Sequence, residues 1–165
     1  CMTGVQSCDL PIFELAFSDK YSPKDGPSAA VVSALLTDSI ITGEDIDPDF
    51  AATGDMTAAG EVRPVGGLSG KVSGAIKKDC KIIGIPAPNQ NSIEDLYIID
   101  GIRQIYEIQI FSLKTFDEAH DLAIAKRAKD LQTAIDEFAN RQSALNRSEQ
   151  PRDGKEGKSR GSPDT

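Results

Sequence analysis

The sequence predicts an α+β fold in which small sheets pack against helices. Short apolar or alternating segments, which are typical of strands, take turns along the chain with segments whose apolar residues suit helices. Clusters of glycine, proline and polar residues separate these segments. The 165 residues are enough for one domain with its own core. The same alternation occurs in α/β proteins, so that class stays open as the alternative.

Four short segments are expected to be strands, because each is rich in aliphatic or aromatic residues. The first and the last also alternate between apolar and polar positions, and a proline ends the third. A fifth piece, EVRPV, lies between glycines and is expected to be extended. The four strands are predicted at residues 11–17, 50–53, 80–86 and 104–111.

Four other segments are expected to be helical. The first is apolar on nearly all sides, which predicts a buried helix; it begins beside Pro27 and ends at Gly43. The last begins with a capping box, in which Thr115 is the N-cap and Glu118 follows three positions later. The helices are predicted at residues 28–41, 68–79, 91–99 and 115–141.

A single domain is predicted over residues 10–141. Residues 1–9 show no clear pattern and are expected to be unstructured or a truncated start. Residues 142–165 are polar and charged with almost no hydrophobic side chains, so we expect a disordered tail there. The chain begins with Cys1 rather than Met and shows no signal peptide, which indicates a fragment whose start has been lost. A mature lipoprotein cysteine is the alternative.

Composition argues against several classes of function. A formal net charge of −8 repels phosphate backbones, so we expect no nucleic-acid partner. No apolar run reaches the roughly 18 residues that a membrane span needs, so we expect no membrane partner. Three cysteines without a Cys-x-x-Cys pair argue against a disulfide framework and a zinc site. We therefore expect no metal and no cofactor in this chain, and a cytoplasmic location, with an exported form as the alternative.

The stretch SPKDGPSAA places Ser28 at a sharp corner just before an apolar helix. In one interpretation Ser28 only caps the helix, which is the usual role of serine at a helix start. In the other it is a nucleophile, and backbone N–H groups at the helix start stabilise an oxyanion. A serine hydroxyl is a poor nucleophile without a base, so the second interpretation needs a base elsewhere in the chain.

That base would be either the single histidine or a lysine. His120 lies on the late helix without a loop or glycine nearby, and is expected to be an ordinary solvated or helix-end side chain. Lys71 is surrounded by small and apolar residues, as a lysine must be if its neutral amine is to act as a base. Lys77 and Lys78 resemble ordinary solvated charges at a helix end. Ser28 and Lys71 are therefore the candidate pair.

The glycines near Lys71 do not form a phosphate-binding loop. Gly66 and Gly70 enclose three residues where the P-loop motif has four, and Val72 follows the lysine where that motif needs Ser or Thr. We therefore do not expect this segment to bind a nucleotide.

Two separated motifs resemble the proteolytic domain of Lon-type proteases. Ser28 and Lys71 stand 43 positions apart, as in that family, and the resemblance extends over about residues 13–123. It includes KIIGIPAPNQNSIEDL, which is like the strand and polar turn that follow the family's lysine helix. The motifs are PKDGPSA at residues 23–29, TGD at 53–55 and PVGGL at 64–68, followed by Lys71.

The resemblance implies a mixed α/β, Lon-type domain and a Ser-Lys dyad peptidase. Ser28 would be the nucleophile. Lys71 would be the general base and then the general acid toward the leaving amine. Thr53 matches the family threonine whose hydroxyl helps to hold the lysine. The family also implies protein or peptide substrates and a homo-oligomeric ring.

Four further residues are implied as supporting ones. Asp25 and Gly26 match the loop beside the nucleophile, where backbone groups contribute to the oxyanion site. Gly66 and Gly67 belong to the matching glycine segment before the lysine helix.

The chain also departs from the family. It has no Walker motif, so ATP would act only through a separate or missing ATPase module. The histidines often found before the serine loop are replaced, with Glu14 and Ala16 in that region. The acidic tail helix and the flanks of the serine at residues 22–30 look unlike the common ATPase-linked forms, which favours an ATPase-free relative over a Lon protease whose ATPase was lost to truncation. A non-catalytic module of the same fold that binds peptides or proteins is the alternative function, and intact Ser28 and Lys71 argue against it.

Overall fold

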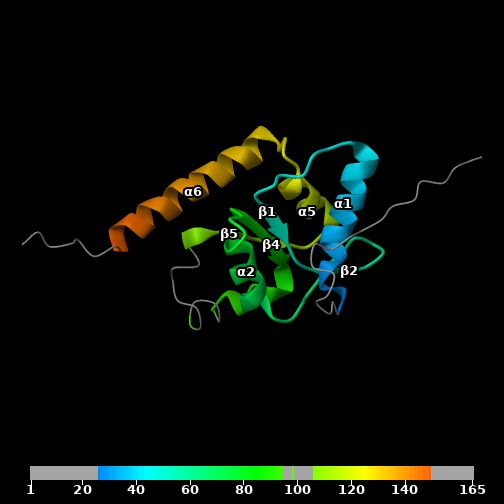
Figure 1. The fold of residues 1–165 in the computed structure, drawn as a ribbon, viewed down its shortest axis with the longest axis horizontal. Helices are drawn as coiled ribbons and strands as arrows, with labels where there is room; N and C mark the ends of the chain where they lie inside the picture. Colours follow the sequence, from blue (N-terminus) through cyan, green and yellow to red (C-terminus); the bar gives the residue numbers. More distant parts are fainter. Residues whose placement is uncertain (1–25, 95–97, 99–105, 150–165) are drawn as a thin grey trace, which may run out of the picture.

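A computed structural model describes residues 26–94, Ile98 and residues 106–149 of the chain (Figure 1). Helices and short strands alternate along the described residues, which confirms the predicted α+β class. In chain order the elements are η1 (Pro27–Ala29), α1 (Ala30–Thr42), β1 (Phe50–Ala52), β2 (Asp55–Met56), β3 (Val62–Arg63), α2 (Leu68–Ile76), β4 (Ile82–Pro86), η2 (Ala87–Asn89), β5 (Gln109–Leu113), α5 (Phe116–Ala123) and α6 (Lys129–Glu149).

Within the described residues, three parallel strands form the main sheet in the order β1–β4–β5, with β4 in the centre. In this register Gly84 of β4 aligns with Ala52 on one side and with Phe111 on the other. β2 and β3 form a separate antiparallel pair. Because the strands of the main sheet run in one direction, their carboxyl ends lie at the same edge, where open sheets commonly carry functional residues.

Helices cover both faces of the main sheet (Figure 1). On one face α1, α5 and α6 surround a core cluster that contains Val31 and Ile82. On the other face α2 packs in a second cluster that contains Val72 and Ile83. Successive residues of a strand point to opposite faces, so β4 supplies side chains to both clusters and ties the layers together.

α1 forms where the sequence predicts a helix, with a short 3-10 turn in front of it. Gly43 ends it in the left-handed region with φ 75°, a conformation that favours glycine. Val31 and Leu35 are buried, whereas Ile40 and Ile41 are exposed. The helix is therefore buried on one side, not on nearly all sides as predicted.

The single helix predicted over residues 115–141 is wrong, because the structure has two helices there. α5 begins as predicted, with Thr115 Oγ1 accepting a hydrogen bond from the Glu118 N–H at 3.3 Å. It ends because Ile124 turns to an extended conformation and forms an antiparallel bridge with Ile46. Pairing with the distant segment after α1 thus overrides the local preference for helix.

Arg127 fixes the junction between α5 and α6. Its side chain is 4 % exposed and its Nη2 lies 2.7 Å from Asp47 Oδ2. Its Nε donates a hydrogen bond to the Leu122 carbonyl at 2.7 Å, and Nη1 donates to Gln132 Oε1 at 3.4 Å. One guanidinium therefore links α5, α6 and the loop that follows α1.

α6 also extends farther than predicted, to Glu149, whereas the polar tail is predicted from Gln142. The Gln142 side chain is buried, and its Nε2 donates a hydrogen bond to the Ile108 carbonyl at 3.2 Å. Phe138 contacts Phe111 edge to face, with ring centroids 6.1 Å apart. These contacts place α6 against the β5 side of the sheet and explain why the helix passes the predicted boundary.

Other boundaries shift by a few residues. The strand predicted at 104–111 is β5, displaced toward its C-terminal end, and residues 106–107 are helical. α2 ends at Ile76, three residues before its predicted end. The predicted strand at 11–17 and most of the predicted tail lie outside the described residues. So does part of the helix predicted at 91–99, of which residues 92–94 and Ile98 are helical.

Candidate active site

Ser28 lies in η1, the 3-10 turn before α1, and is partly buried. The N-cap residue of η1 is Gly26 and that of α1 is Ala29, and neither helix has a side-chain cap hydrogen bond at its start. Ser28 is therefore not an N-cap residue, which one interpretation of the sequence expected it to be. Its hydroxyl is directed to a different partner.

The main chain of Ser28 is held by the segment that follows β1. Its carbonyl O accepts hydrogen bonds from the Gly54 N–H at 3.0 Å and from Thr53 Oγ1 at 3.2 Å. The Thr53 N–H in turn donates to the Gly84 carbonyl of β4 at 3.0 Å, and the Val31 N–H donates to the Gly54 carbonyl at 3.2 Å. These bonds fix the serine turn at the carboxyl end of β1.

Gly54 is the point of closest approach between the serine helix and the sheet. A Cβ at this position would lie 2.8 Å from Val31 Cγ2 and 3.0 Å from Val62 Cγ1, closer than side chains pack. Glycine is needed at Gly54 for lack of space, while its own backbone conformation is an ordinary one.

Lys71 comes to the site from the other face of the sheet. It lies in the first turn of α2, and its N–H donates to the Gly67 carbonyl at 3.3 Å. Gly67 precedes the helix in the left-handed region with φ 66°. The neighbours Leu68 and Val72 are buried in the core cluster on that face, so the helix is packed while Lys71 itself is only partly buried.

The structure brings Ser28 and Lys71 together. Lys71 Nζ lies 3.4 Å from Ser28 Oγ, at the long end of the hydrogen-bond range. Contacts between a nucleophile and its base are often this long without substrate and shorten when substrate binds. A neutral amine at this distance can take the proton of the serine hydroxyl.

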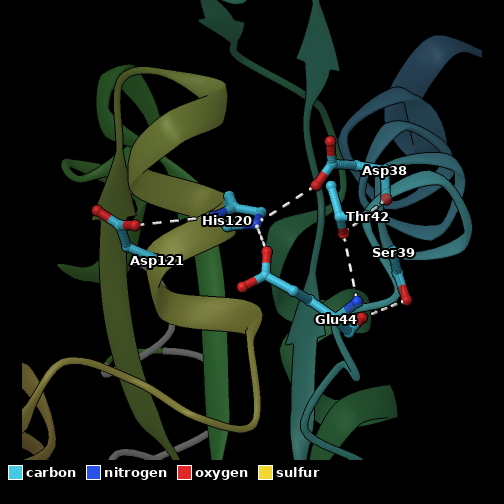
Figure 2. A network of polar contacts seen from close by, with 6 residues as sticks. All are labelled: Asp38, Ser39, Thr42, Glu44, His120 and Asp121. Carbon is cyan, nitrogen blue, oxygen red and sulfur yellow. Dashed lines mark hydrogen bonds and ion pairs between the residues drawn. The ribbon is translucent and has the colours of Figure 1, made fainter.

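His120 lies beside Asp38 and Glu44, near the C-terminal end of α1 (Figure 2). Its Nε2 lies 3.2 Å from Glu44 Oε2 and 3.3 Å from Asp38 Oδ2, and its Nδ1 lies 3.7 Å from Asp121 Oδ1. Ten helical or near-helical positions separate Asp38 from Ser28, which is about 15 Å along the axis. His120 links α5 to α1 and does not contact the serine.

The supporting residues are placed as follows. Thr53 is 5 % exposed, and its hydroxyl donates to the Ser28 carbonyl; a role at the Lys71 amine stays a prediction. Gly26 has φ 84° and is exposed beside the serine turn. Gly66 and Gly67 form the turn into α2. Asp25 lies outside the described residues.

Asn89 is a buried polar residue near the site that the sequence analysis did not single out. Its side chain bonds to both polar groups of the Val65 main chain, directly before the turn that leads to Lys71. Its only signal in the sequence is its place in the polar turn after a buried strand. That signal does not reveal a partner 24 positions away.

The described residues contain neither a metal-binding cluster nor a helix that could span a membrane. No group of three or more His, Cys, Asp or Glu side chains in ranges 26–94 and 106–149 is arranged to hold a metal ion. Within the same part of the chain, no helix has the length and apolar character to cross a membrane.

The chain is similar in sequence to proteins named Lon protease. The chain is 34 % identical over 105 residues to a Lon protease of Desulforamulus reducens, covering 58 % of this chain and 13 % of that protein. It is 38 % identical over 97 residues to a Lon protease of Methanosarcina barkeri, covering 59 % of this chain and 12 % of that one. With the Lon protease of Escherichia coli K12 it shares 33 % identity over 111 residues, covering 67 % and 14 %.

The matched segments thus span only about one seventh or less of these much longer relatives. The family model for the C-terminal proteolytic domain of Lon proteases matches residues 15–126, which is more than half of the chain and includes both Ser28 and Lys71. This chain belongs to the family of Lon protease C-terminal proteolytic domains.

Proposed function

We propose that this chain is a serine endopeptidase that hydrolyses peptide bonds in protein substrates, with Ser28 as nucleophile and Lys71 as base. The observation that carries the proposal is the contact of Lys71 Nζ with Ser28 Oγ at 3.4 Å. Membership of the Lon proteolytic family supports it. A serine and a lysine this close, presented from two helices at one edge of a sheet, are the two parts that nucleophilic catalysis needs.

Acylation begins when the neutral amine of Lys71 accepts the proton of the Ser28 hydroxyl. The Ser28 oxygen attacks the carbonyl carbon of the substrate, and the carbonyl oxygen becomes an oxyanion. Backbone N–H groups at the start of α1 and in the loop beside Gly26 are the proposed donors to that oxyanion. The Lys71 ammonium then gives its proton to the leaving nitrogen, the C–N bond breaks, and an acyl-enzyme ester remains on Ser28.

Deacylation repeats these steps with water. Neutral Lys71 takes a proton from a water molecule, whose oxygen attacks the ester carbonyl. The second tetrahedral intermediate collapses, the C–O bond to Ser28 breaks, and Lys71 returns its proton to the serine oxygen. The second product leaves as a carboxylic acid.

The dyad chemistry uses side chains alone, so we propose that this chain needs no cofactor for peptide hydrolysis. Any dependence on ATP would come through a separate or missing ATPase module. We also propose that the chain assembles into a homo-oligomeric ring and acts in the cytoplasm. The relatives to which the chain is similar are named Lon protease, which supports the proposal that its substrates are proteins.

The test compares the wild-type chain with Ser28→Ala on a fluorogenic peptide and on an unfolded protein. We expect Ser28→Ala to lose cleavage while keeping its circular dichroism spectrum. Ser33→Ala, which changes a serine of α1 away from Lys71, is the matched control and should keep activity. Cleavage by Ser28→Ala at the wild-type rate would reject the dyad.

The second candidate function is a non-catalytic module that binds peptides or proteins. Binding would not need the serine hydroxyl beside an amine, so the contact between Ser28 and Lys71 favours catalysis. A wild-type chain that binds peptides but cleaves none of them would favour the module.

A further inference from the structure

We propose that Asn89 is a positioning residue for Lys71, an inference that rests on the proposed function above. The Asn89 side chain is 8 % exposed and lies in η2, directly after β4. Its Oδ1 accepts a hydrogen bond from the Val65 N–H at 2.9 Å, and its Nδ2 donates to the Val65 carbonyl O at 2.9 Å. One carboxamide thus engages both polar groups of a residue 24 positions away.

This pair of bonds acts like one step of an antiparallel ladder, in which two amide groups exchange donor and acceptor. Only one orientation of the carboxamide fits, because a flipped Asn89 would face donor with donor and acceptor with acceptor. Asn89 is buried, so losing either bond leaves a polar group without compensation from water. Asn89 therefore fixes the position of Val65 strongly and in a defined direction.

The turn after Val65 consists of two glycines with open space beside them. A Cβ on Gly66 or on Gly67 would meet nothing within 4 Å. α2 starts without a side-chain cap hydrogen bond. Glycine can adopt many backbone conformations. Asn89 holds Val65, the residue directly before the two glycines.

The two hydrogen bonds between Asn89 and Val65 determine where Lys71 lies along the sheet. The apolar side of α2, which includes Leu68 and Val72, decides which face of the helix is turned inward. Hydrophobic contact has no preferred direction, so it does not by itself fix how far the helix slides. A misplacement of about 1 Å at a reacting group can cost roughly 100-fold in rate.

Both members of the dyad are thus held by residues that directly follow two neighbouring strands. The Ser28 carbonyl is bonded to Thr53 and Gly54, directly after β1. Asn89, directly after β4, holds the segment that leads into Lys71. Since β1 and β4 are paired, the distance between serine and lysine is set by the sheet.

The test measures kcat and KM separately for Asn89→Ala and Asn89→Asp on a fluorogenic peptide. The aspartate keeps an acceptor for the Val65 N–H but, as a carboxylate, cannot donate to the carbonyl. Gln142→Ala is the matched control, because it also removes a buried carboxamide that donates to a main-chain carbonyl, that of Ile108 and not that of Val65. Each variant is also assayed for its melting temperature, and the wild type for hydrogen exchange of the Val65 amide.

We expect Asn89→Ala to lower kcat by about 10-fold or more with KM nearly unchanged. Asn89→Asp should lose at least as much, because a carboxylate oxygen would face the Val65 carbonyl oxygen, and Gln142→Ala should keep the wild-type kcat. The Val65 amide should exchange slowly, a result that needs neither activity nor a stable variant.

Fast exchange, or a wild-type kcat in Asn89→Asp, would overturn the proposal. Loss of kcat in Gln142→Ala equal to that in Asn89→Ala would also overturn it, because general destabilisation would then explain both. Failure of the proposed function itself gives a different result, since Ser28→Ala would then be as active as wild type.

Discussion

Thr53 donates its hydroxyl to the main-chain carbonyl of Ser28 at 3.2 Å, across 25 positions of sequence. The same carbonyl accepts the Gly54 N–H at 3.0 Å. Thr53 is thus bonded to the backbone of the candidate nucleophile, whereas the family resemblance assigns its hydroxyl to the lysine. The serine turn and the end of β1 form one hydrogen-bonded unit.

Thr53→Val should weaken the hold on the serine turn while keeping the shape of the buried side chain. The Ser28 carbonyl keeps its bond from Gly54, so we expect a loss of about 1 kcal/mol in unfolding free energy together with lower kcat/KM. Thr53→Ser keeps the hydroxyl and should keep more of the activity. Equal activity in Thr53→Val and wild type would show that this bond does not matter for catalysis.

Gly54→Ala should destabilise the fold by about 1–3 kcal/mol, because its Cβ would meet Val31 Cγ2 at 2.8 Å in a closely packed core. Gly74→Ala is the matched control: it lies within α2, and a Cβ there meets nothing within 4 Å. That change should stabilise the protein by about 0.5–1 kcal/mol. Chemical denaturation of both variants measures the difference, and equal effects would contradict the close approach.

Arg127→Met should destabilise the protein by about 3 kcal/mol, because it leaves the partly buried Asp47 carboxylate without its partner and removes the bond to the Leu122 carbonyl. Lys126→Met, at the exposed neighbouring position, should have little effect. The two variants are compared by urea denaturation. An unchanged midpoint in Arg127→Met would mean that the junction between α5 and α6 does not depend on the guanidinium.

Burial raises the pKa of the Cys80 thiol above its ordinary value, and the nearby Asp49 carboxylate raises it further. The folded state therefore holds the thiol proton more tightly than the unfolded state does. This contribution to stability is fully present below the unfolded pKa and is lost as the pH rises above it. We expect Cys80 to be alkylated by iodoacetamide more slowly in the folded protein than in urea at pH 8, as peptide mass mapping would measure.

The same relationship predicts that Asp49→Asn speeds the alkylation of folded Cys80, because it removes a negative charge that disfavours the thiolate. Asp79→Asn should act in the same direction but less, since Asp79 contributes less to the shift than Asp49 does. No change in either variant would leave burial as the whole cause.

The sequence predicts the class of the fold and the candidate pair because both depend on local chemistry. Gly43 ends α1 and Thr115 starts α5 through bonds within a few residues. Ser28 and Lys71 stand out in the sequence because of their chemical types and their small neighbours. Their approach to 3.4 Å depends on tertiary structure, and only the family resemblance indicated it before the structure did.

The parts that the sequence analysis missed depend on distant partners. The break after α5 comes from the bridge of Ile124 with Ile46 and from the pairing of Arg127 with Asp47. Helical patterning within residues 115–141 contains no sign of either partner. Asn89 was missed for the same reason, because an asparagine after a strand is an ordinary turn residue until its bonds to Val65 are seen.

The most direct test of the central claim is the kcat/KM of Lys71→Arg for peptide hydrolysis, beside Lys77→Arg at an exposed position of the same segment. A guanidinium keeps the positive charge of lysine but stays protonated, so it cannot accept the proton of Ser28. We predict that Lys71→Arg is as inactive as Ser28→Ala, while Lys77→Arg keeps wild-type activity. Substantial activity in a folded Lys71→Arg protein would reject Lys71 as the base, because Lys71 would then supply only charge.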